Sequence, residues 1–499
     1  MQRRKTTITR VGDVLIGAGG ITLSPSGELE GGYPIRVQSM NTTDTNDTAA
    51  CVAQAKRIID AGGELVRLTT QGSREANNMA NISAALKADG YNQPLVADVH
   101  FNANVADVAA KYCEKVRVNP GNYVDPARVF KHLEYTDEEY QQELQKIRDR
   151  FVPFLNICKE HKTAVRIGVN HGSLSDRIMS RYGDTPAGIV ESCLEFLRIC
   201  RDEDFNDVVI SIKASNTVVM VQSVRLLVEK MDAENLHYPL HLGVTEAGEG
   251  EDGRIKSAVG IGALLTEGIG DTIRVSLSEE PECEIPVAKK LVSFIEECAE
   301  KRENARIEDG TLYLSFNENN LEDLQLKAAM TAGALLIDGK AKELVIENEG
   351  TLTQQQTTNT QHPTPNTQHP ATNTQHPTPN TLKDLSDSIL QAARVRFTKT
   401  EYISCPGCGR TLYDLQGTIA RIKAAVAEKA KENPRFSTLK IGIMGCIVNG
   451  PGEMADADYG YVGAGPNKIS LYKNKECIMK GIPEADAVEK LLAFIEADL

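Results

Sequence analysis

Eight short runs rich in β-branched and other apolar residues alternate, between residues 34 and 300, with longer segments that carry apolar residues at helical spacing. A spacing of roughly thirty residues between such runs is typical of repeated βα units. The runs are Pro34–Met40, Glu64–Thr69, Pro94–His100, Lys115–Asn119, Thr163–Asn170, Asp207–Ala214, Pro239–Thr245 and Asp271–Ser276. Because eight parallel strands with eight crossovers close most simply into a barrel, we predict an α/β fold, a (β/α)8 TIM barrel, for residues 1–300.

Polar residues gather at the carboxyl ends of these runs. Alternate residues of a barrel strand face inward, and the polar ones near the carboxyl end line the mouth where barrel enzymes bind their substrates. These positions, spaced by two or four and therefore on one face, are Arg67, Thr69, Asp98, His100, Arg117, Asn119, Arg166, Asn170, Lys213, His241, Thr245, Arg274 and Ser276. Any one arginine among them, taken singly, is better explained by an ion pair inside the barrel.

Five of these strand ends are cationic, although the chain has a net charge of −14 and a pI near 5.3. Burying five cations together is costly unless anions accompany them. We therefore predict a pocket for a polyanion, most economically a diphosphate held by charge-assisted hydrogen bonds. The same net charge argues against nucleic acid or an anionic membrane as a partner, because no bulk positive field would collect phosphates.

Cysteines near the end of the chain form a candidate metal centre. Cys405 and Cys408 have the C-x-x-C spacing of thiolates that hold one soft metal centre, and Cys446 follows separately. Glu453 lies seven positions further on in a Gly/Pro-rich loop and would complete the set with a hard ligand. A carboxylate corner can be vacated for substrate, which favours a working site, yet spacing alone leaves a structural zinc site and an iron–sulfur centre both open.

The chain changes character after residue 300. Residues 301–350 contain a strand-like Thr311–Ser315 and a helix-like Leu324–Leu336, too little for a core of their own, so we expect them to pack on another part. Residues 351–381 repeat Asn-Thr-Gln-His-Pro at a seven-residue period, and we predict a disordered low-complexity linker. From 382 to 499 helices and strands alternate around the cysteines, which predicts a small α+β cluster domain.

The cellular location follows from what the sequence lacks. The start, Met1-Gln-Arg-Arg-Lys, has no apolar segment behind its basic residues, and no run of about 18 apolar residues occurs. Eleven cysteines, an odd number, show no disulfide framework. We expect a cytoplasmic protein.

Several longer motifs stand out along the chain. They are Cys405-Pro-Gly-Cys408-Gly-Arg-Thr-Leu, Met444-Gly-Cys-Ile-Val-Asn-Gly-Pro-Gly-Glu-Met-Ala-Asp-Ala-Asp-Tyr459, Val37-Gln-Ser-Met40, Arg117-Val-Asn-Pro-Gly121, Gly168-Val-Asn-His-Gly-Ser-Leu174, Ser211-Ile-Lys-Ala-Ser215 and Arg274-Val-Ser276. Together they closely resemble a known family, the 4-hydroxy-3-methylbut-2-enyl diphosphate synthases of the non-mevalonate isoprenoid pathway. The resemblance implies an iron–sulfur oxidoreductase that reductively opens 2-C-methyl-D-erythritol 2,4-cyclodiphosphate, and it favours a [4Fe-4S] cluster over zinc.

The resemblance also implies which residues act. The cluster ligands would be Cys405, Cys408, Cys446 and Glu453, with Glu453 a ligand that can yield to substrate. The substrate would be bound by Arg67, His100, Arg117, Asn119, Arg166, Asn170, Lys213, Thr245, Arg274 and Ser276, and His100 would orient it or supply a proton. Electrons would come from flavodoxin or ferredoxin, since the chain shows no flavin or nicotinamide fingerprint.

One departure from the family concerns the middle of the chain. The sequences of the barrel motifs resemble those of the longer, three-domain form of the family. The region between the barrel and the cluster domain is short, however, so we expect a truncated middle domain. On that ground we predict a homodimer in which the cluster domain of one chain closes over the barrel of the other. The rival interpretations are a phosphate-binding barrel with a zinc-stabilised module, and a barrel aldolase or phosphotransferase indifferent to the cysteines.

Overall fold

The computed structural model describes residues 2–17, 21–23, 29–126, 131–352, 382–448, 450–454 and 456–499, with only the backbone for 21–23 and 29–31. The predicted linker, residues 351–381, therefore lies outside the described residues except for its first two positions.

The eight predicted runs form one parallel sheet, which confirms the barrel. Its strands are β5 (Arg36–Met40), β6 (Leu65–Thr70), β7 (Leu95–Val99), β8 (Lys115–Val118), β9 (Ala164–Asn170), β10 (Val208–Lys213), β11 (His241–Leu242) and β12 (Thr272–Ile273). The strand order is β10-β9-β8-β7-β6-β5-β12-β11, and a parallel bridge between Ile210 and Leu240 joins the two ends. The sheet is therefore closed, and all carboxyl ends face one mouth.

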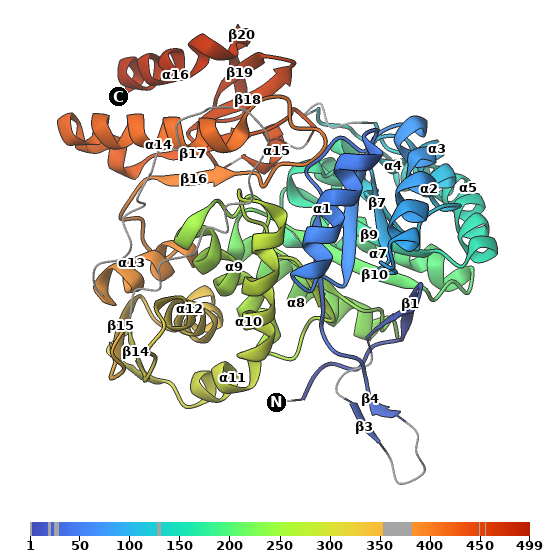
Figure 1. The fold of residues 1–499 in the computed structure, drawn as a ribbon, viewed down its shortest axis with the longest axis horizontal. Helices are drawn as coiled ribbons and strands as arrows, with labels where there is room; N and C mark the ends of the chain where they lie inside the picture. Colours follow the sequence, from blue (N-terminus) through green and yellow to red (C-terminus); the bar gives the residue numbers. More distant parts are fainter. Residues whose placement is uncertain are drawn as a thin grey trace.

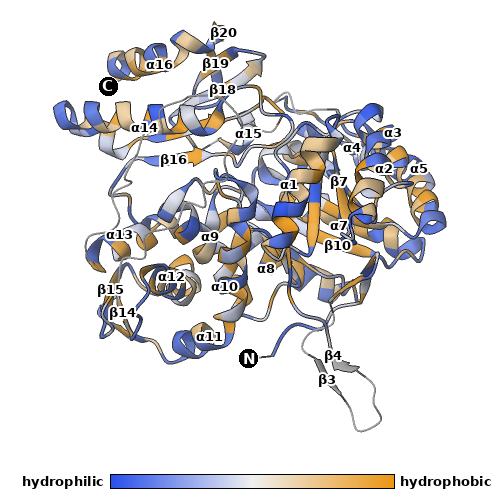
Figure 2. Ribbon diagram, in the orientation of Figure 1, coloured by the Kyte–Doolittle hydropathy of each residue, from blue (hydrophilic) through white to orange (hydrophobic). Residues whose placement is uncertain are grey.

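Helices surround the barrel because the outward residues of its strands are apolar. Val165, Ile167 and Val169 of β9, for example, belong to the core shared with the helices. The helices are α1 (Thr48–Asp60), α2 (Ser73–Ala88), α3 (Ala103–Ala109), α4 (Pro120–Tyr123), α5 (Asp137–His161), α6 (Asp176–Tyr182), α7 (Pro186–Asp202), α8 (Thr217–Ala233), α9 (Gly250–Leu265), α10 (Glu284–Ser293) and α11 (Ile295–Glu303). Figure 2 shows hydrophobic strands such as β7 and β10 beneath helices with hydrophilic outer faces.

A hairpin near the N-terminus covers the end of the barrel opposite the mouth. Its strands are β1 (Thr9–Val11) and β2 (Val14–Ile16), and a second short hairpin pairs β3 (Ile21–Leu23) with β4 (Leu29–Gly31). Val11 and Ile16 pack on the inward residues Leu65, Val96 and Ala164. Since apolar side chains close this end, the polar ends of the strands are accessible only from the mouth.

Residues 301–350 pack on the barrel. They form β13 (Arg306–Glu308), β14 (Thr311–Phe316), α12 (Leu321–Ile337) and β15 (Glu343–Asn348), with the sheet order β13-β14-β15. The helix α12 is buried along almost its whole length, as expected for a helix that is apolar on all sides, and it lies against α9. This segment therefore extends the barrel core and has no separate one.

The helix α13 (Leu382–Ala392) corrects the start that we assigned to the cluster domain. We predicted that residues 382–499 belong together, but Leu385, Ile389 and Leu390 share the core of the barrel and of α12. The helix packs against β15 and α9. Its apolar face is thus buried on the barrel side, and the cluster domain begins after it.

The cluster domain has a five-stranded mixed sheet with its own core. Its elements are β16 (Glu401–Ser404), α14 (Leu415–Glu432), β17 (Lys440–Met444), α15 (Gly450–Glu453), β18 (Tyr459–Gly465), β19 (Lys468–Lys473), β20 (Glu476–Pro483) and α16 (Glu484–Asp498), with the strands in sequence order across the sheet. Ile419, Ile441, Tyr461 and Leu491 lie in this core. Figure 1 shows the domain, in orange and red, resting across the barrel and the helix α13.

No helix among the described residues is long and apolar enough to cross a membrane. None of the eleven cysteines, all of which lie in the described part of the chain, forms a disulfide.

Candidate active site

A cavity of about 100 Å³ lies between the barrel mouth and the cluster domain. The barrel contributes Met40, Arg67, Asp98, His100, Arg117, Arg166, Asn170, Lys213, Thr245, Glu246, Arg274 and Ser276, and the cluster domain contributes Cys405, Pro406, Gly407, Cys408, Arg410, Met444, Cys446, Val448 and Gly450. The structure thus brings together the two groups of residues that the sequence singled out separately, the strand ends and the cysteines.

Asn119 is the one predicted substrate-binding residue that is absent from this lining, and the strand-end residues Thr69 and His241 are absent from it as well. Its Oδ1 accepts a hydrogen bond from the backbone amide of Gly121 at 3.2 Å, and its Nδ2 donates to Ser173 Oγ at 2.8 Å. Asn119 therefore caps the short helix α4 and ties it to the turn after β9, which occupies both ends of its amide. Asn119 does lie at the end of its strand, as predicted. Its side chain, however, holds α4 and the turn after β9 together and does not line the cavity.

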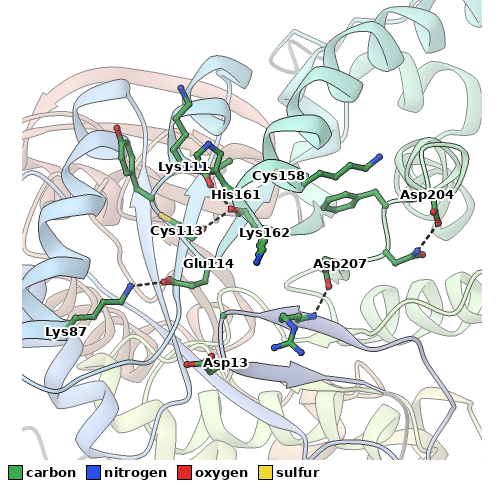
Figure 3. Close-up of a pocket in the computed structure, with 18 residues that line it drawn as sticks. Asp13, Lys87, Lys111, Cys113, Glu114, Cys158, His161, Lys162, Asp204 and Asp207 are labelled. Atoms are coloured by element: carbon green, nitrogen blue, oxygen red, sulfur yellow. Dashed lines mark hydrogen bonds and ion pairs between the residues drawn. The ribbon is translucent and has the colours of Figure 1, made fainter.

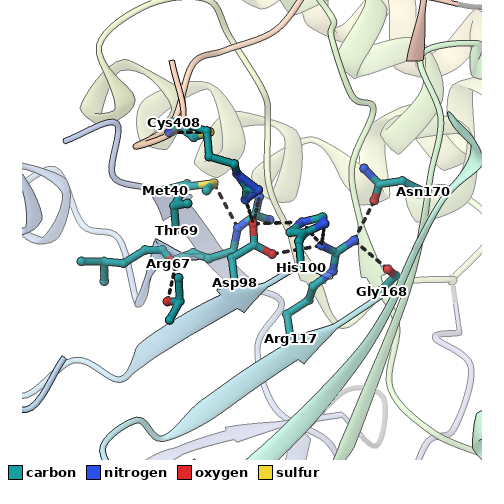
Figure 4. A network of polar contacts seen from close by, with 12 residues as sticks. Met40, Arg67, Thr69, Asp98, His100, Arg117, Gly168, Asn170 and Cys408 are labelled. Atoms are coloured by element: carbon teal, nitrogen blue, oxygen red, sulfur yellow. Dashed lines mark hydrogen bonds and ion pairs between the residues drawn. The ribbon is translucent and has the colours of Figure 1, made fainter. Parts of the chain in front are cut away.

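Asp98 at the end of β7 is the anion around which the cations of the mouth are arranged (Figure 4). Its Oδ1 lies 3.1 Å from Arg117 Nη1, and its Oδ2 lies 3.7 Å from Arg67 Nη2. Arg117 also donates to the Gly168 carbonyl at 2.7 Å and to Asn170 Oδ1 at 3.1 Å. These contacts hold Arg117 in one orientation before any ligand binds.

Positive charge in the mouth exceeds what its carboxylates neutralise. Arg166 is fully buried, and its Nε and Nη1 have no hydrogen-bond partner among the described residues. Burial and the neighbouring Arg67, Arg166 and Arg274 hold the pKa of Lys213 well below its ordinary value. Burial, opposed by Asp98 and reinforced by the surrounding arginines, lowers the pKa of Arg67 to about 10. Such a site favours an anion with several negative oxygens.

His100 is neutral in this environment. Burial and the charges of Arg117 and Arg410 lower the pKa of His100 to about 3, despite the opposing effect of Asp98. Its ring contacts Arg117 and lies 3.5 Å from Asp98 Oδ2. Without bound substrate the imidazole thus carries no spare proton at neutral pH, which supports the orienting role over the proton source.

The cysteine loops present sulfur to the same cavity. The amide of Gly445 donates to Cys405 Sγ at 3.2 Å, and the amide of Arg410 donates to Cys408 Sγ at 3.4 Å. Backbone amides in this position stabilise negative charge on sulfur. Among the described residues, no three His, Cys, Asp or Glu side chains are gathered closely enough to hold one metal ion.

Glu453 approaches the mouth from α15 and is buried. Thr245 Oγ1 donates to its Oε2 at 3.0 Å, whereas Oε1 has no hydrogen-bond partner in the described part of the chain. Burial and the adjacent carboxyl of Glu246 raise the pKa of Glu453 well above its ordinary value. An unpartnered buried carboxylate oxygen is costly, so this group is suited to a cation or to a shared proton.

The two domains meet within a single chain through both side-chain and backbone contacts. Ser215 Oγ donates to the carbonyl of Glu453 at 2.9 Å, and Lys256 Nζ pairs with Glu401 at 3.0 Å. A side-chain carbon added at Gly172 would lie only 2.4 Å from the amide nitrogen of Glu453. This chain closes over its own barrel, which differs from the closure between two chains that we predicted, and no second copy is needed to complete the site. The homodimer itself stays a prediction.

Sequence reasoning missed Glu246 and Arg410, and it left Asp98 out of the substrate pocket. Asp98 was singled out as a strand-end residue on the inward face with His100, two positions away, but an acid did not fit the expected anion pocket. Glu246 follows Thr245 directly in a loop that bends back into the mouth. Arg410 follows Cys408 by two positions and reaches across the domain boundary, which no local pattern indicates.

A larger hollow of about 930 Å³ lies at the opposite end of the barrel (Figure 3). It is lined by residues that precede strands, such as Glu114 and Asp207, and by lysines at the ends of helices. Lys87 is paired there with Glu114 at 3.3 Å. Lysines at helix carboxyl ends complement the helix dipoles, and none of the predicted site residues lies in this hollow.

Comparison with known families supports the same assignment of parts. A model described as the GcpE TIM-barrel domain matches residues 25–289, and one described as the GcpE protein C-terminal domain matches residues 401–497. The second match begins at β16, after the helix α13, in agreement with the packing described above.

Relatives in several bacteria match almost the whole chain. Proteins named 4-hydroxy-3-methylbut-2-en-1-yl diphosphate synthase (flavodoxin) are 50% identical in Bacteroides fragilis, over 99% of this chain and 96% of the relative, and 47% identical in Bacteroides thetaiotaomicron, over 99% and 98%. A protein of the same name from Phocaeicola vulgatus is 49% identical over 94% and 96%. The first alignment runs over 645 positions against 499 residues here, so at least 146 of its positions have no counterpart in this chain.

Proposed function

The chain belongs to the GcpE family, and from this premise we propose that it reductively opens 2-C-methyl-D-erythritol 2,4-cyclodiphosphate and removes a hydroxyl group to give (E)-4-hydroxy-3-methylbut-2-enyl diphosphate. The reaction is a step of isoprenoid biosynthesis by the non-mevalonate pathway. The observation that carries the proposal is a single cavity with unneutralised cations on one wall and three cysteines on the other.

The cation wall suits the diphosphate. Arg166 offers two unpartnered nitrogen donors from inside the barrel, and Lys213 has no carboxylate partner within salt-bridge distance among the described residues. Arg117 is already oriented by Asp98 and by the Gly168 carbonyl. Preorganised charge-assisted donors of this kind bind phosphate oxygens without a free-energy cost of reorientation. Asn170 and Ser276 would orient the sugar-derived part of the substrate.

The cysteine wall suits a [4Fe-4S] cluster with Cys405, Cys408, Cys446 and Glu453 as ligands. In such a cluster each ligand binds a different iron atom, so thiolates surround a cavity and need not converge on one ion. The amides that donate to the sulfurs of Cys405 and Cys408, and the free Oε1 of Glu453, fit this group. When bound, the cluster supplies the electrons for the reaction one at a time.

The remaining residues position the substrate and keep water out. Thr245 holds Glu453 through Oε2 and so directs the other carboxylate oxygen. The backbones of Gly172 and Gly452 are in close contact beside Glu453 and leave no room there for a side chain. Because the closed site has a low effective dielectric, each cation acts more strongly on the diphosphate than it would in water.

We propose flavodoxin as the electron donor, because the names of the relatives include it. The reaction would take place in the cytoplasm. We further propose that the segment missing relative to the long family members is the middle domain, that the part which remains is residues 301–350 with α13, and that residues 351–381 bridge the deletion.

Anaerobic reconstitution tests the proposal. The loaded protein should contain iron and sulfide and should convert the cyclodiphosphate in the presence of an artificial one-electron reductant. Cys446→Ala should abolish both the cluster and turnover, whereas Cys477→Ala, a cysteine of the same domain that does not line the cavity, should retain both. A colourless protein with one zinc ion and no turnover would exclude the redox function.

A further inference from the structure

We propose that Arg410 is a substrate-binding residue supplied by the cluster domain, which contacts the diphosphate together with Arg117 of the barrel. The inference rests on the proposed function, since it requires a diphosphate in the cavity. It adds to that function a binding residue from the domain that otherwise provides only cluster ligands.

The position of Arg410 carries the inference. Its Nη2 lies 2.9 Å from Asp98 Oδ2, while Arg117 Nη1 lies 3.1 Å from Asp98 Oδ1. Two guanidinium groups that bind the two oxygens of one carboxylate are close enough to bind one phosphate group as well. Asp98 therefore occupies the place of an anionic group shared by both domains.

A second indication of a ligand is that the Nε donor of Arg410 is unused. The residue is 7% exposed and lines the cavity, and its Nε has no hydrogen-bond partner among the described residues. A buried guanidinium nitrogen without a partner is costly, and a phosphate oxygen would satisfy it. The pairing with Asp98 leaves this donor unused, so Asp98 alone does not account for the position of Arg410.

The cations around Arg410 affect how readily the cluster domain closes over the barrel. Arg410 lies close enough to Arg67 and His100 for its charge to lower the pKa of both groups. Closing the cluster domain without substrate therefore moves a cation towards other cations, with only Asp98 in compensation. A diphosphate reverses this balance, so substrate and cluster domain should bind to the barrel cooperatively.

Calorimetric titration of the full-length, cluster-loaded protein with the cyclodiphosphate, without reductant, tests the proposal. We expect Arg410→Gln to bind at least tenfold more weakly than the wild type, and Arg410→Lys, which keeps the charge, to recover part of the affinity. Arg421→Gln is the matched control, because it removes an arginine of the same domain that does not line the cavity. Arg421 is half exposed, and its ion pair with Glu484 is long, at 3.7 Å. This variant should bind as the wild type does.

Lys256→Met separates direct binding from a merely structural role, because it removes another ion pair between the domains, Lys256 Nζ to Glu401 at 3.0 Å, and Lys256 does not line the cavity. If Arg410 binds the substrate, Lys256→Met binds it about as tightly as the wild type does. If Arg410 only holds the domains together, then Lys256→Met weakens binding as much as Arg410→Gln does, and the proposal is overturned. It is also overturned if Arg410→Gln alone binds normally, a result that needs no second variant. A wild-type protein that does not bind the cyclodiphosphate would instead remove the proposed function, and this inference with it.

Discussion

Gly172→Ala should stop the cluster domain from closing while it leaves both halves of the site intact. The added carbon would lie 2.4 Å from the amide nitrogen of Glu453 and 2.4 Å from the carbonyl carbon of Gly452, whereas ordinary contact begins at 3.4 Å. Both neighbours are backbone atoms, so the segment that carries Glu453 must retreat by about 1 Å. A retreat of that size breaks the hydrogen bond of 3.0 Å from Thr245 to Glu453.

The expected loss of turnover is large, because a displacement of about 1 Å in an active site can cost roughly a hundredfold in rate. Turnover of the cyclodiphosphate with an artificial one-electron reductant measures this loss, while iron content should stay at the wild-type level. Gly465→Ala is the control, since the nearest atom to its added carbon is 4.0 Å away. If Gly172→Ala turns over at the wild-type rate, the backbone contact between the domains does not control closure and our reasoning is wrong.

Four further predictions concern charge, stability and assembly. Lys213→Ala and Arg274→Ala should each weaken substrate binding by about 1.5–3 kcal/mol in a titration, but only Arg274→Ala should lower the Tm, because it leaves the buried Glu284 without its partner at 2.8 Å. Lys115 is fully buried with no hydrogen-bond partner for Nζ among the described residues, and burial holds its pKa well below the ordinary value. Between the two pKa values the unfolded chain binds a proton that the folded chain does not, so the free energy of unfolding should rise with pH towards the ordinary lysine pKa. Denaturation of Lys115→Met at several pH values should show a smaller rise. Glu453→Ala should leave three thiolates and a cluster that oxygen degrades faster, seen as bleaching, whereas Glu453→Cys should be sturdier and slower; full turnover by the cysteine variant would show that this ligand need not yield. Mixing Lys213→Ala chains with Cys446→Ala chains should restore no activity, because each chain closes on itself, and recovery would show closure between chains.

The sequence by itself determined the barrel, the strand-end positions and the cysteine set. Strand alternation is a local property, so the spacing of two between Arg117 and Asn119, or of four between Arg166 and Asn170, fixes which side chains share the inward face. The apolar outward residues of the same strands require helices to cover them, and this requirement predicts the barrel without knowledge of any long-range contact.

The tertiary structure decided how those side chains are used. Asn119 faces the mouth side of its strand, yet its amide caps α4, because the turn that carries Ser173 happens to lie beside it. The helix α13 follows the repeat tract but packs on α9 and β15, where its apolar face finds a matching surface. Arg410 meets Asp98 across 312 positions of sequence. Periodicity describes one element at a time, whereas each of these contacts depends on the relative placement of different elements, which only the tertiary packing determines.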